Sequence, residues 1–427
     1  MIRILGGLLG SAGALLVVAC AGDPSDRAAD RGEGSWAVER HERAGTEFVR
    51  NLGASDAPIS MHEELRIGSL EGPPHEAFGS IDGVRAAPDG SFAVLDARSF
   101  QVHRYDAEGR HLGSFGSRGE GPGEFTAPNG LARLPAGGYL VVDGRPVARL
   151  HRFTDEGTLL GSEALPLNAM GAPVVERAGA VLVPFRLPPA PGGQAATEAW
   201  HRIPPDGAGA DTLRLPELAL NPAWTIHVVD ETMRRGFHAT VPFTPRAMAV
   251  RHPDGGWVAG TGERYEIFRI TDQGDTLQVI EREAERALVD PAEADDARER
   301  ILAQARNVDP EWRWTAPEVP GEKPFFRSIV MGQDGSLGVW RHTAGEPAEL
   351  PAEVANLPPG QGPPRWVQPP VLDLFAPDGC FMGTLALPVG TGLMAFSLER
   401  AFLRERDALD VEQLVRVRLE PAITCPD

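Results

Sequence analysis

Positive charge is scarce in this chain. Its 427 residues include 41 Lys and Arg against 60 Asp and Glu, and the formal net charge is −19. Nucleic acid is therefore not an expected partner, because binding its phosphates requires a basic surface. Lysine is almost absent, since Lys323 is the only one in the chain. We interpret this bias toward arginine as genomic base composition rather than function.

Catalytic motifs are missing as well. The sequence contains no Gly-x-Ser-x-Gly nucleophile elbow, no His-Glu-x-x-His zinc motif, no P-loop and no Gly-x-Gly-x-x-Gly fingerprint after a strand. Asp295, Asp296 and Glu299 lie close together, but a solvated helix face explains them better than a metal cluster. No catalytic residue, no metal ligand and no cofactor is predicted.

Long apolar runs are absent except at residues 4–18, which follow the short positive segment Met1–Arg3. That run is too short for a membrane span and has the proportions of a signal peptide, predicted over residues 1–19. Val17-Val18-Ala19-Cys20 resembles the bacterial lipobox, which implies that Cys20 is lipidated and anchors the protein to a membrane. The alternative is an ordinary signal peptide with an incidental cysteine.

The residues after Cys20 bear on the cellular location of the protein. Ala21 stands where an aspartate would resemble an inner-membrane retention signal, so an outer-membrane location is expected if the source is Gram-negative. Residues 20–60 are polar and charged and lack periodicity, which predicts a flexible tether.

A repeat of 47 residues is the strongest positive signal. Six positions recur at this distance: Gly72, Phe78, Gly83, Pro88, Gly90 and Asp96 return as Gly119, Phe125, Gly130, Pro135, Gly137 and Asp143. Such periods indicate stacked supersecondary units. Within each unit two tight turns separate short β-branched and aromatic runs, which predicts four antiparallel strands and therefore a propeller blade.

Counting these units gives six blades over residues 61–427, an all-β fold with one short helical insertion. The sixth blade lacks a fourth strand at its C-terminal end. Residues 63–69 align with the fourth strand of the first blade, so we expect this N-terminal strand to close the ring.

The segment FGSRGEGPGEFTAPNGLARL (115–134) resembles the NHL repeat family. The chain as a whole is similar to bacterial six-bladed NHL-like propeller lipoproteins over roughly residues 60 to 421. Propellers of this kind include ligand binders, scaffolds, hydrolases and lyases. Gluconolactonase-type propellers have a similar architecture and bind a divalent metal through Glu, Asn and Asp, but only Asn129 matches a plausible position here.

Three cysteines remain to be interpreted. With Cys20 assigned to lipid, Cys380 and Cys425 remain in an oxidising compartment and fall at the same end of neighbouring blades. A disulfide that pins the C-terminal tail is the preferred interpretation. The alternative is two unpaired buried thiols.

Long insertions identify a candidate working face. They all fall at the end of the propeller that carries the b–c and d–a connections: 186–199, 218–244, 286–324 and 341–371. Long loops on a rigid scaffold commonly carry binding sites. Neutral insertions at an exposed end are the alternative.

One insertion is predicted to contain a helix. Asp290 suits the N-cap, Pro291 the first helical position, and Glu293 the third position of a capping box. We expect this helix to lie across the elaborated face. Trp312 and Trp314 follow, and either form an aromatic wall over a pocket or anchor the insertion to the blades.

Four residues open innermost strands on that face and are candidate ligand-binding residues: His75, Asn129, Arg246 and Arg327. Two arginines at a central channel can hold a carboxylate, phosphate or sulfate. In the alternative, each pairs with a local acid. The leading hypothesis is a membrane-anchored binding or scaffolding propeller for an unknown protein or small anionic ligand. A propeller enzyme, either a metal-dependent hydrolase such as a lactonase or a lyase, is the second.

Overall fold

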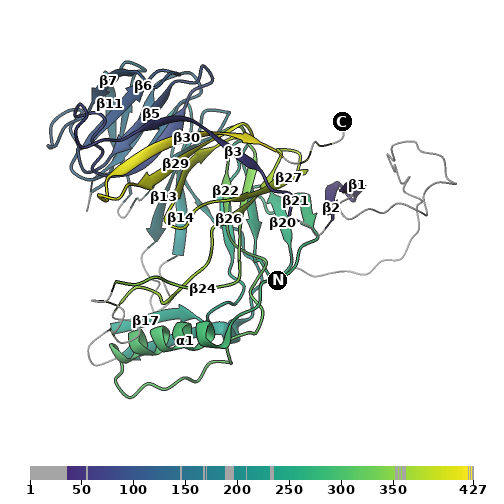
Figure 1. Cartoon of the computed structure of the whole chain (residues 1–427). Helices are drawn as coiled ribbons and strands as arrows, with labels where there is room; N and C mark the ends of the chain where they lie inside the picture. The colour runs from purple at the N-terminus through teal and green to yellow at the C-terminus, as the bar shows by residue number, and fades with distance from the viewer. Residues whose placement is uncertain are drawn as a thin grey trace.

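The computed structural model describes residues 36–53, 56–144, 147–166, 169, 171–187, 197–207, 209–230, 235–351, 354, 357, 362–421, 423 and 425 (Figure 1). Six sheets follow one another, each containing four antiparallel blade strands, and form the predicted six-bladed propeller. The signal peptide and Cys20 lie outside the described residues.

The blades contain the following strands. Blade one has β4 (Ile81–Ala86), β5 (Phe92–Asp96), β6 (Gln101–Tyr105) and β7 (His111–Phe115); blade two has β8 (Pro128–Arg133), β9 (Tyr139–Asp143), β10 (Arg149–Phe153) and β11 (Leu159–Ala164). Blade three has β12 (Val174–Val175), β13 (Val181–Leu187), β14 (Thr197–Ile203) and β15 (Asp211–Arg214); blade four has β18 (Met248–Arg251), β19 (Trp257–Gly260), β20 (Glu266–Ile270) and β21 (Thr276–Arg282). Blade five has β22 (Phe326–Met331), β23 (Leu337–Arg341), β26 (Val371–Phe375) and β27 (Phe381–Ala386).

Blade six confirms the predicted ring closure. Its strands β28 (Gly392–Phe396), β29 (Arg400–Arg406) and β30 (Glu412–Glu420) are completed by β3 (Ser60–Ile67), which pairs antiparallel with β30. The closing strand begins at Ser60, three residues before the predicted start. An edge strand is thereby paired rather than exposed.

The hydrophobic core lies between neighbouring blades. Between blades one and two, Leu95, Leu131 and Val141 are fully buried in one cluster. The recurring glycine of the innermost strand has a steric reason, because a Cβ on Gly130 would lie 2.2 Å from the backbone oxygen of Gly171. Blade-to-blade contact at this point therefore requires glycine.

The recurring aspartate ties each blade to the connection that enters it. Asp96 accepts hydrogen bonds from the backbone N–H groups of Gly79 and Ser80, both at 2.9 Å. Asp143 does the same for Thr126 and Ala127, at 2.9 and 2.8 Å. The repeat thus preserves a buried carboxylate that satisfies backbone donors at the start of the innermost strand.

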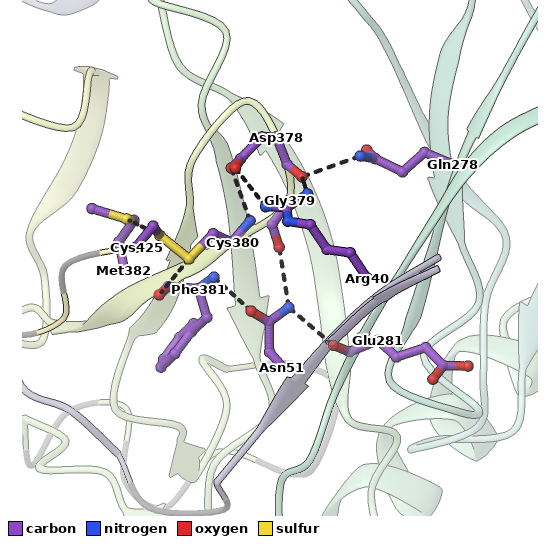
Figure 2. The surroundings of a disulfide bond; sticks show 10 residues. All are labelled: Arg40, Asn51, Gln278, Glu281, Asp378, Gly379, Cys380, Phe381, Met382 and Cys425. Atoms are coloured by element: carbon purple, nitrogen blue, oxygen red, sulfur yellow. Dashed lines mark hydrogen bonds and ion pairs between the residues drawn. A yellow bond between two sulfur atoms is a disulfide. The ribbon is translucent and has the colours of Figure 1, made fainter. Parts of the chain in front are cut away.

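The predicted tether over residues 20–60 is wrong for residues 37–52. Here β1 (Ala37–Arg43) and β2 (Thr46–Leu52) form a hairpin, and β2 pairs in parallel with β21, so that the sheet of blade four has six strands. Asn51, which is 1% exposed, fixes the hairpin to blade five. Its side chain accepts from the N–H of Phe381 at 2.8 Å and donates to the carbonyl of Gly379 at 3.1 Å (Figure 2).

The predicted disulfide between Cys380 and Cys425 is present. It lies beside Asn51 and the turn of blade five, as Figure 2 shows. The backbone N–H of Ile423 donates to the carbonyl of Met382 at 3.3 Å. The C-terminal tail is therefore fixed to the outer strand of blade five, close to the N-terminal hairpin.

Tight turns occupy one end of the propeller, and blade-to-blade hydrogen bonds connect several of them. Arg177 of blade three pairs with Asp254 of blade four at 2.5 Å and donates to the carbonyl of Asp334 of blade five at 3.3 Å. Gln333 accepts from the N–H of Ala86 of blade one at 3.2 Å. These contacts join the blades at this end of the propeller. The long insertions lie at the opposite end.

The opposite end carries the insertions, as predicted for 218–244, 286–324 and 341–371; residues 188–196 of the fourth lie outside the described residues. Parts of the first two insertions form a small unit that we call the cap, and residues 320–324 of the second insertion return the chain to blade five. The cap contains the 3₁₀ turn η1 (Pro222–Trp224), β16 (Thr225–Asp230), β17 (Arg235–Thr240) and α1 (Pro291–Arg306). The third insertion contributes the short pair β24 (Glu346–Pro347) and β25 (Trp366–Val367).

The predicted helix exists and begins where expected. The Asp290 side chain accepts from the N–H of Ala292 at 2.8 Å, and Pro291 is the first helical residue. Glu293 does not complete a capping box, because its carboxylate accepts instead from Lys323. The helix does not lie across the blades, contrary to expectation. It packs on the cap hairpin β16–β17, since Ala305 and Ile301 share a core with Val228 (Figure 1).

Candidate functional site

Several innermost strands have a β-bulge near their first residue, at the end of the propeller that carries the insertions. In four blades the ladder register shifts within the first residues of this strand, and the residue at the shift is Asp82, Asn129, Arg327 or Met394. A β-bulge of this kind re-aims a side chain. Asn129 and Arg327 were predicted at these positions; Asp82 and Met394 were not, because a bulge leaves no clear mark in the sequence.

Arg246 and Arg327 both lie on this end of the propeller, at blades four and five. The backbone N–H of Arg246 donates to the carbonyl of Thr261 at 3.1 Å, which fixes it at the entry to blade four. The guanidinium carbon of Arg327 lies 5.6 Å from the centre of the Trp340 ring, and its Nε donates to the carbonyl of Arg341 at 3.4 Å. Both residues are exposed.

Neither guanidinium has an ion-pair partner within the described part of the chain. Two other arginines of blade four are ion-paired: Arg282 with Asp373 at 2.5 Å and Arg264 with Glu266 at 2.8 Å. The alternative in which each candidate arginine is locked to a local acid is therefore not what the structure shows.

His342 lies within the field of both arginines. Burial lowers the pKa of its imidazole most, and the charges of Arg327, Lys323 and Arg246 lower it further, so that it falls to about 4 despite a hydrogen bond to Gln368. His342 Nδ1 lies 2.9 Å from Gln368 Oε1. The imidazole is therefore neutral at neutral pH, and it adds no positive charge beside the two arginines.

A buried ion pair between Lys323 and Glu293 lies close to His342. Lys323 Nζ lies 2.7 Å from Glu293 Oε1 and donates to the carbonyl of Thr343 at 2.8 Å. Both side chains are almost fully buried, and the ammonium lies 4.9 Å from the centre of the Phe243 ring. The pair joins α1 of the cap to the start of blade five, next to His342. In the sequence, Lys323 stands out only as the single lysine of the chain.

An arginine on the innermost strand of blade one was also missed. Arg85 on β4 has no acidic partner among the residues that the structure describes, and burial lowers its pKa to about 10. Its guanidinium donates to the carbonyl of Val84 at 2.7 Å. Positive charge without a matching carboxylate is thus found on the innermost strands of blades one and five.

Asn129 occupies the bulge of β8 in blade two. Its side-chain oxygen and nitrogen are both shielded from solvent, and neither has a hydrogen-bond partner in the described region. No hydrogen bond joins it, among the described residues, to Arg246 or Arg327, which lie on other blades. Its role as a ligand-binding residue stays a prediction.

His75 lies apart from the arginines, on the connection that enters blade one. Its ring stacks on His111 with centroids 3.8 Å apart, and its backbone carbonyl accepts from the hydroxyl of Tyr105. His111 in turn lies 2.9 Å from the hydroxyl of Ser114. The ring is therefore engaged with blade one, and we do not carry His75 into the proposed ligand site.

Trp312 and Trp314 pack into the core of the cap. Their rings lie 6.2 Å apart at 72°, and both join the cluster that contains Ile226 and Val241. The indole of Trp314 donates to the carbonyl of Pro317 at 3.1 Å. This placement corresponds to anchors rather than to an aromatic wall over a pocket, with the difference that the tryptophans hold the cap together instead of attaching it to the blades.

One arrangement resembles a catalytic triad but recurs between blades. His151 Nδ1 lies 2.7 Å from the hydroxyl of Ser162, and its Nε2 lies 3.9 Å from Asp143. Blade one repeats the histidine–serine contact at the same distance with His103 and Ser114. Equivalent groups in successive blades mark a structural role, as for the recurring aspartate.

Two further observations concern metal ligands and membrane spans in the described residues. In the described parts of the chain, no group of three or more His, Cys, Asp or Glu side chains is placed to hold a metal ion. No helix among the described residues is both long and apolar enough to span a membrane.

A groove of about 360 Å³ lies elsewhere on the same end, between blades six and one. Its lining includes Leu70, Phe78, Arg98 and Leu409. It does not include either candidate arginine, so the arginine pair is identified by its charge and not by a deep cavity.

Comparisons with known proteins establish the fold. No protein-family model matches the chain, and no curated protein matches its sequence. A solved structure of a DUF4221 family member from Bacteroides vulgatus is similar, with a TM-score of 0.52 at 9% identity, covering 86% of this chain and 99% of that one.

Two other solved structures are similar at lower TM-scores. A Bacteroides fragilis protein named as exported has a TM-score of 0.46 at 11% identity, covering 86% of this chain and 97% of its own. Virginiamycin B lyase from Staphylococcus aureus has a TM-score of 0.39 at 11% identity, covering 85% and 100%. At these identities the likeness extends to the six-bladed fold and not to an activity.

Proposed function

We propose that this chain is an exported, membrane-anchored binding propeller that recognises an anionic ligand where blades four and five meet the cap. The observation that carries the proposal is the pair Arg246 and Arg327, two guanidinium groups without acidic partners among the described residues, in a chain of net charge −19.

The chemistry favours a carboxylate, phosphate or sulfate. A guanidinium donates two parallel hydrogen bonds to such a group, and two guanidinium groups supply both charge and geometry. Neutral His342 and the ring of Trp340 supply an apolar or hydrogen-bonding border. The ligand is either a small anion or an anionic group on a protein partner.

Anchoring by lipid at Cys20 is part of the same proposal. The lipobox-like tetrad Val17-Val18-Ala19-Cys20 supports it. The outer membrane is the proposed location. The hairpin β1–β2 would then attach the propeller to the segment that leads to the membrane. No observation within the described residues favours the metal-dependent hydrolase or the lyase, and we do not propose either.

The test is calorimetric titration of the mature chain with inorganic phosphate, sulfate and citrate. The double variant Arg246→Ala, Arg327→Ala should lose at least about tenfold in affinity for each anion that the parent binds, because a charge-assisted hydrogen bond contributes about 1.5–3 kcal/mol. Arg264→Ala is the matched control, since that exposed arginine of the same blade is paired with Glu266.

Thermal melting separates the two explanations of a loss. The double variant should melt within about 2 °C of the parent, because exposed unpaired arginines contribute little to stability. Unchanged binding in the double variant, or no saturable binding of any of the three anions by the parent, would overturn the proposed site.

A further inference from the structure

The outer face of the cap hairpin carries two histidines opposite each other. In the antiparallel register of β16 and β17, His227 pairs with His238. The alternate residues Ile226 and Val228 point the other way and are buried in the cap core. The two imidazoles therefore stand on the solvent side of a hairpin whose inner side is held by packing.

Their geometry brings two ring nitrogens to one point. His227 Nδ1 lies 2.6 Å from His238 Nδ1, and the rings are 4.7 Å apart between centroids at 80°. One Nδ1 therefore donates and the other accepts. Both residues are exposed, and neither is ion-paired with a carboxylate in the described regions. Gly236 leaves the space next to the ring open, since a Cβ there would have no heavy atom nearer than 3.8 Å.

We propose that His227 and His238 form a solvent-open site for a borderline-soft divalent cation such as Zn²⁺ or Cu²⁺. Imidazole suits these metals, whereas Mg²⁺ and Ca²⁺ prefer oxygen ligands. Metal–nitrogen bonds of about 2.0–2.1 Å at a tetrahedral angle require the two nitrogens to be about 3.3 Å apart. Opening the present contact by less than 1 Å meets that requirement, and exposed side chains can move this far.

The site has two protein ligands and open positions. No third ligand is placed beside it among the described residues. Water or an incoming donor group completes the coordination, which makes this an exchange or recruitment site rather than a structural metal centre. It lies on the outer face of the cap hairpin, and the proposal is independent of the arginine pair.

The experiment is titration of the untagged mature chain with Cu²⁺ and Zn²⁺ by calorimetry. The parent should bind one Cu²⁺ ion, and bind it more tightly than Zn²⁺, with no heat for Mg²⁺. His238→Thr should weaken binding at least about tenfold, because one of two ligands is lost. His227→Thr should have the same effect, and threonine keeps the strand preference of both positions.

The matched control is His41→Thr, an exposed histidine on β1 that stacks on Phe48 and touches no second histidine among the described residues. It should bind metal as the parent does. Binding by the parent should weaken on acidification, since the imidazoles must be deprotonated to ligate. Equal affinities for the parent and both hairpin variants, with unchanged melting, would overturn the site and assign any binding to other histidines such as the His75 and His111 stack.

Discussion

The buried pair Lys323–Glu293 should hold the cap on the propeller, and the change Lys323→Met tests this. Methionine fills a similar volume but cannot pair with the carboxylate. Both side chains are almost fully removed from solvent, at 0% and 3% exposed, and the two charged atoms are 2.7 Å apart. The change therefore leaves a buried carboxylate without its counter-ion.

The expected loss is large. Removing one partner of a buried ion pair destabilises by about 3–5 kcal/mol, since the remaining charge is left desolvated. The lost hydrogen bond to the carbonyl of Thr343 contributes to the same total. Replacing both residues, as Lys323→Met with Glu293→Met, should recover most of that loss, because no isolated charge remains. A coupling of this size identifies a direct interaction.

The assay is urea unfolding followed by tryptophan fluorescence, because Trp312 and Trp314 lie in the cap core. The matched control is Arg298→Met, on the same helix, where an exposed pair with Asp295 at 3.3 Å should contribute less than about 1 kcal/mol. If Lys323→Met shifts the transition no more than Arg298→Met does, the buried pair is not what holds the cap.

Four further predictions follow from features described above. Cys20→Ala should release the protein from membranes and abolish labelling by radioactive fatty acid; a mutant that stays membrane-bound, with an unlabelled parent, argues against the lipid anchor. Deleting residues 60–67 should abolish cooperative folding, because blade six loses its fourth strand; a parent-like melting curve would contradict the closure. Asn51→Leu should destabilise by about 2–4 kcal/mol, since buried backbone groups of blade five lose their partner, and hydrogen exchange in residues 37–52 should rise; unchanged exchange would refute this. For His342 the folded pKa of about 4 lies below the unfolded value of about 6.5, so its contribution to stability is present above pH 6.5 and is lost as pH falls toward 4; His342→Gln should flatten that part of the stability profile, and an unchanged slope would count against a neutral imidazole.

The blades could be predicted because their signals are local. Turn glycines and the recurring aspartate act within one blade, so Asp96 and Asp143 appear at a fixed distance along the chain. The closing strand could be placed because it keeps the pattern of a fourth strand. The disulfide followed from the positions of Cys380 and Cys425 at the same end of adjacent blades.

The parts that were missed depend on partners far away in the sequence. The hairpin at residues 37–52 has only two buried residues, Val49 and Asn51, and its order comes from pairing with β21 and from Asn51. No local pattern reports such a parallel addition. Glu293 has the spacing of a capping box, yet a buried lysine thirty residues later offers a stronger partner. Local rules therefore assigned the right element and the wrong contact.

The pairing of β3 with β30 determines when this protein can finish folding. Ser60 is opposite Glu420 in the register. The ribosome therefore synthesises β3 360 residues before its partner strand β30 is complete. Contacts of such long sequence separation form slowly, because loop closure opposes them. During synthesis the first five blades can assemble as they emerge, but the ring stays open until β30 arrives. An unpaired edge is exposed throughout that interval, which makes the incomplete chain dependent on protection from aggregation.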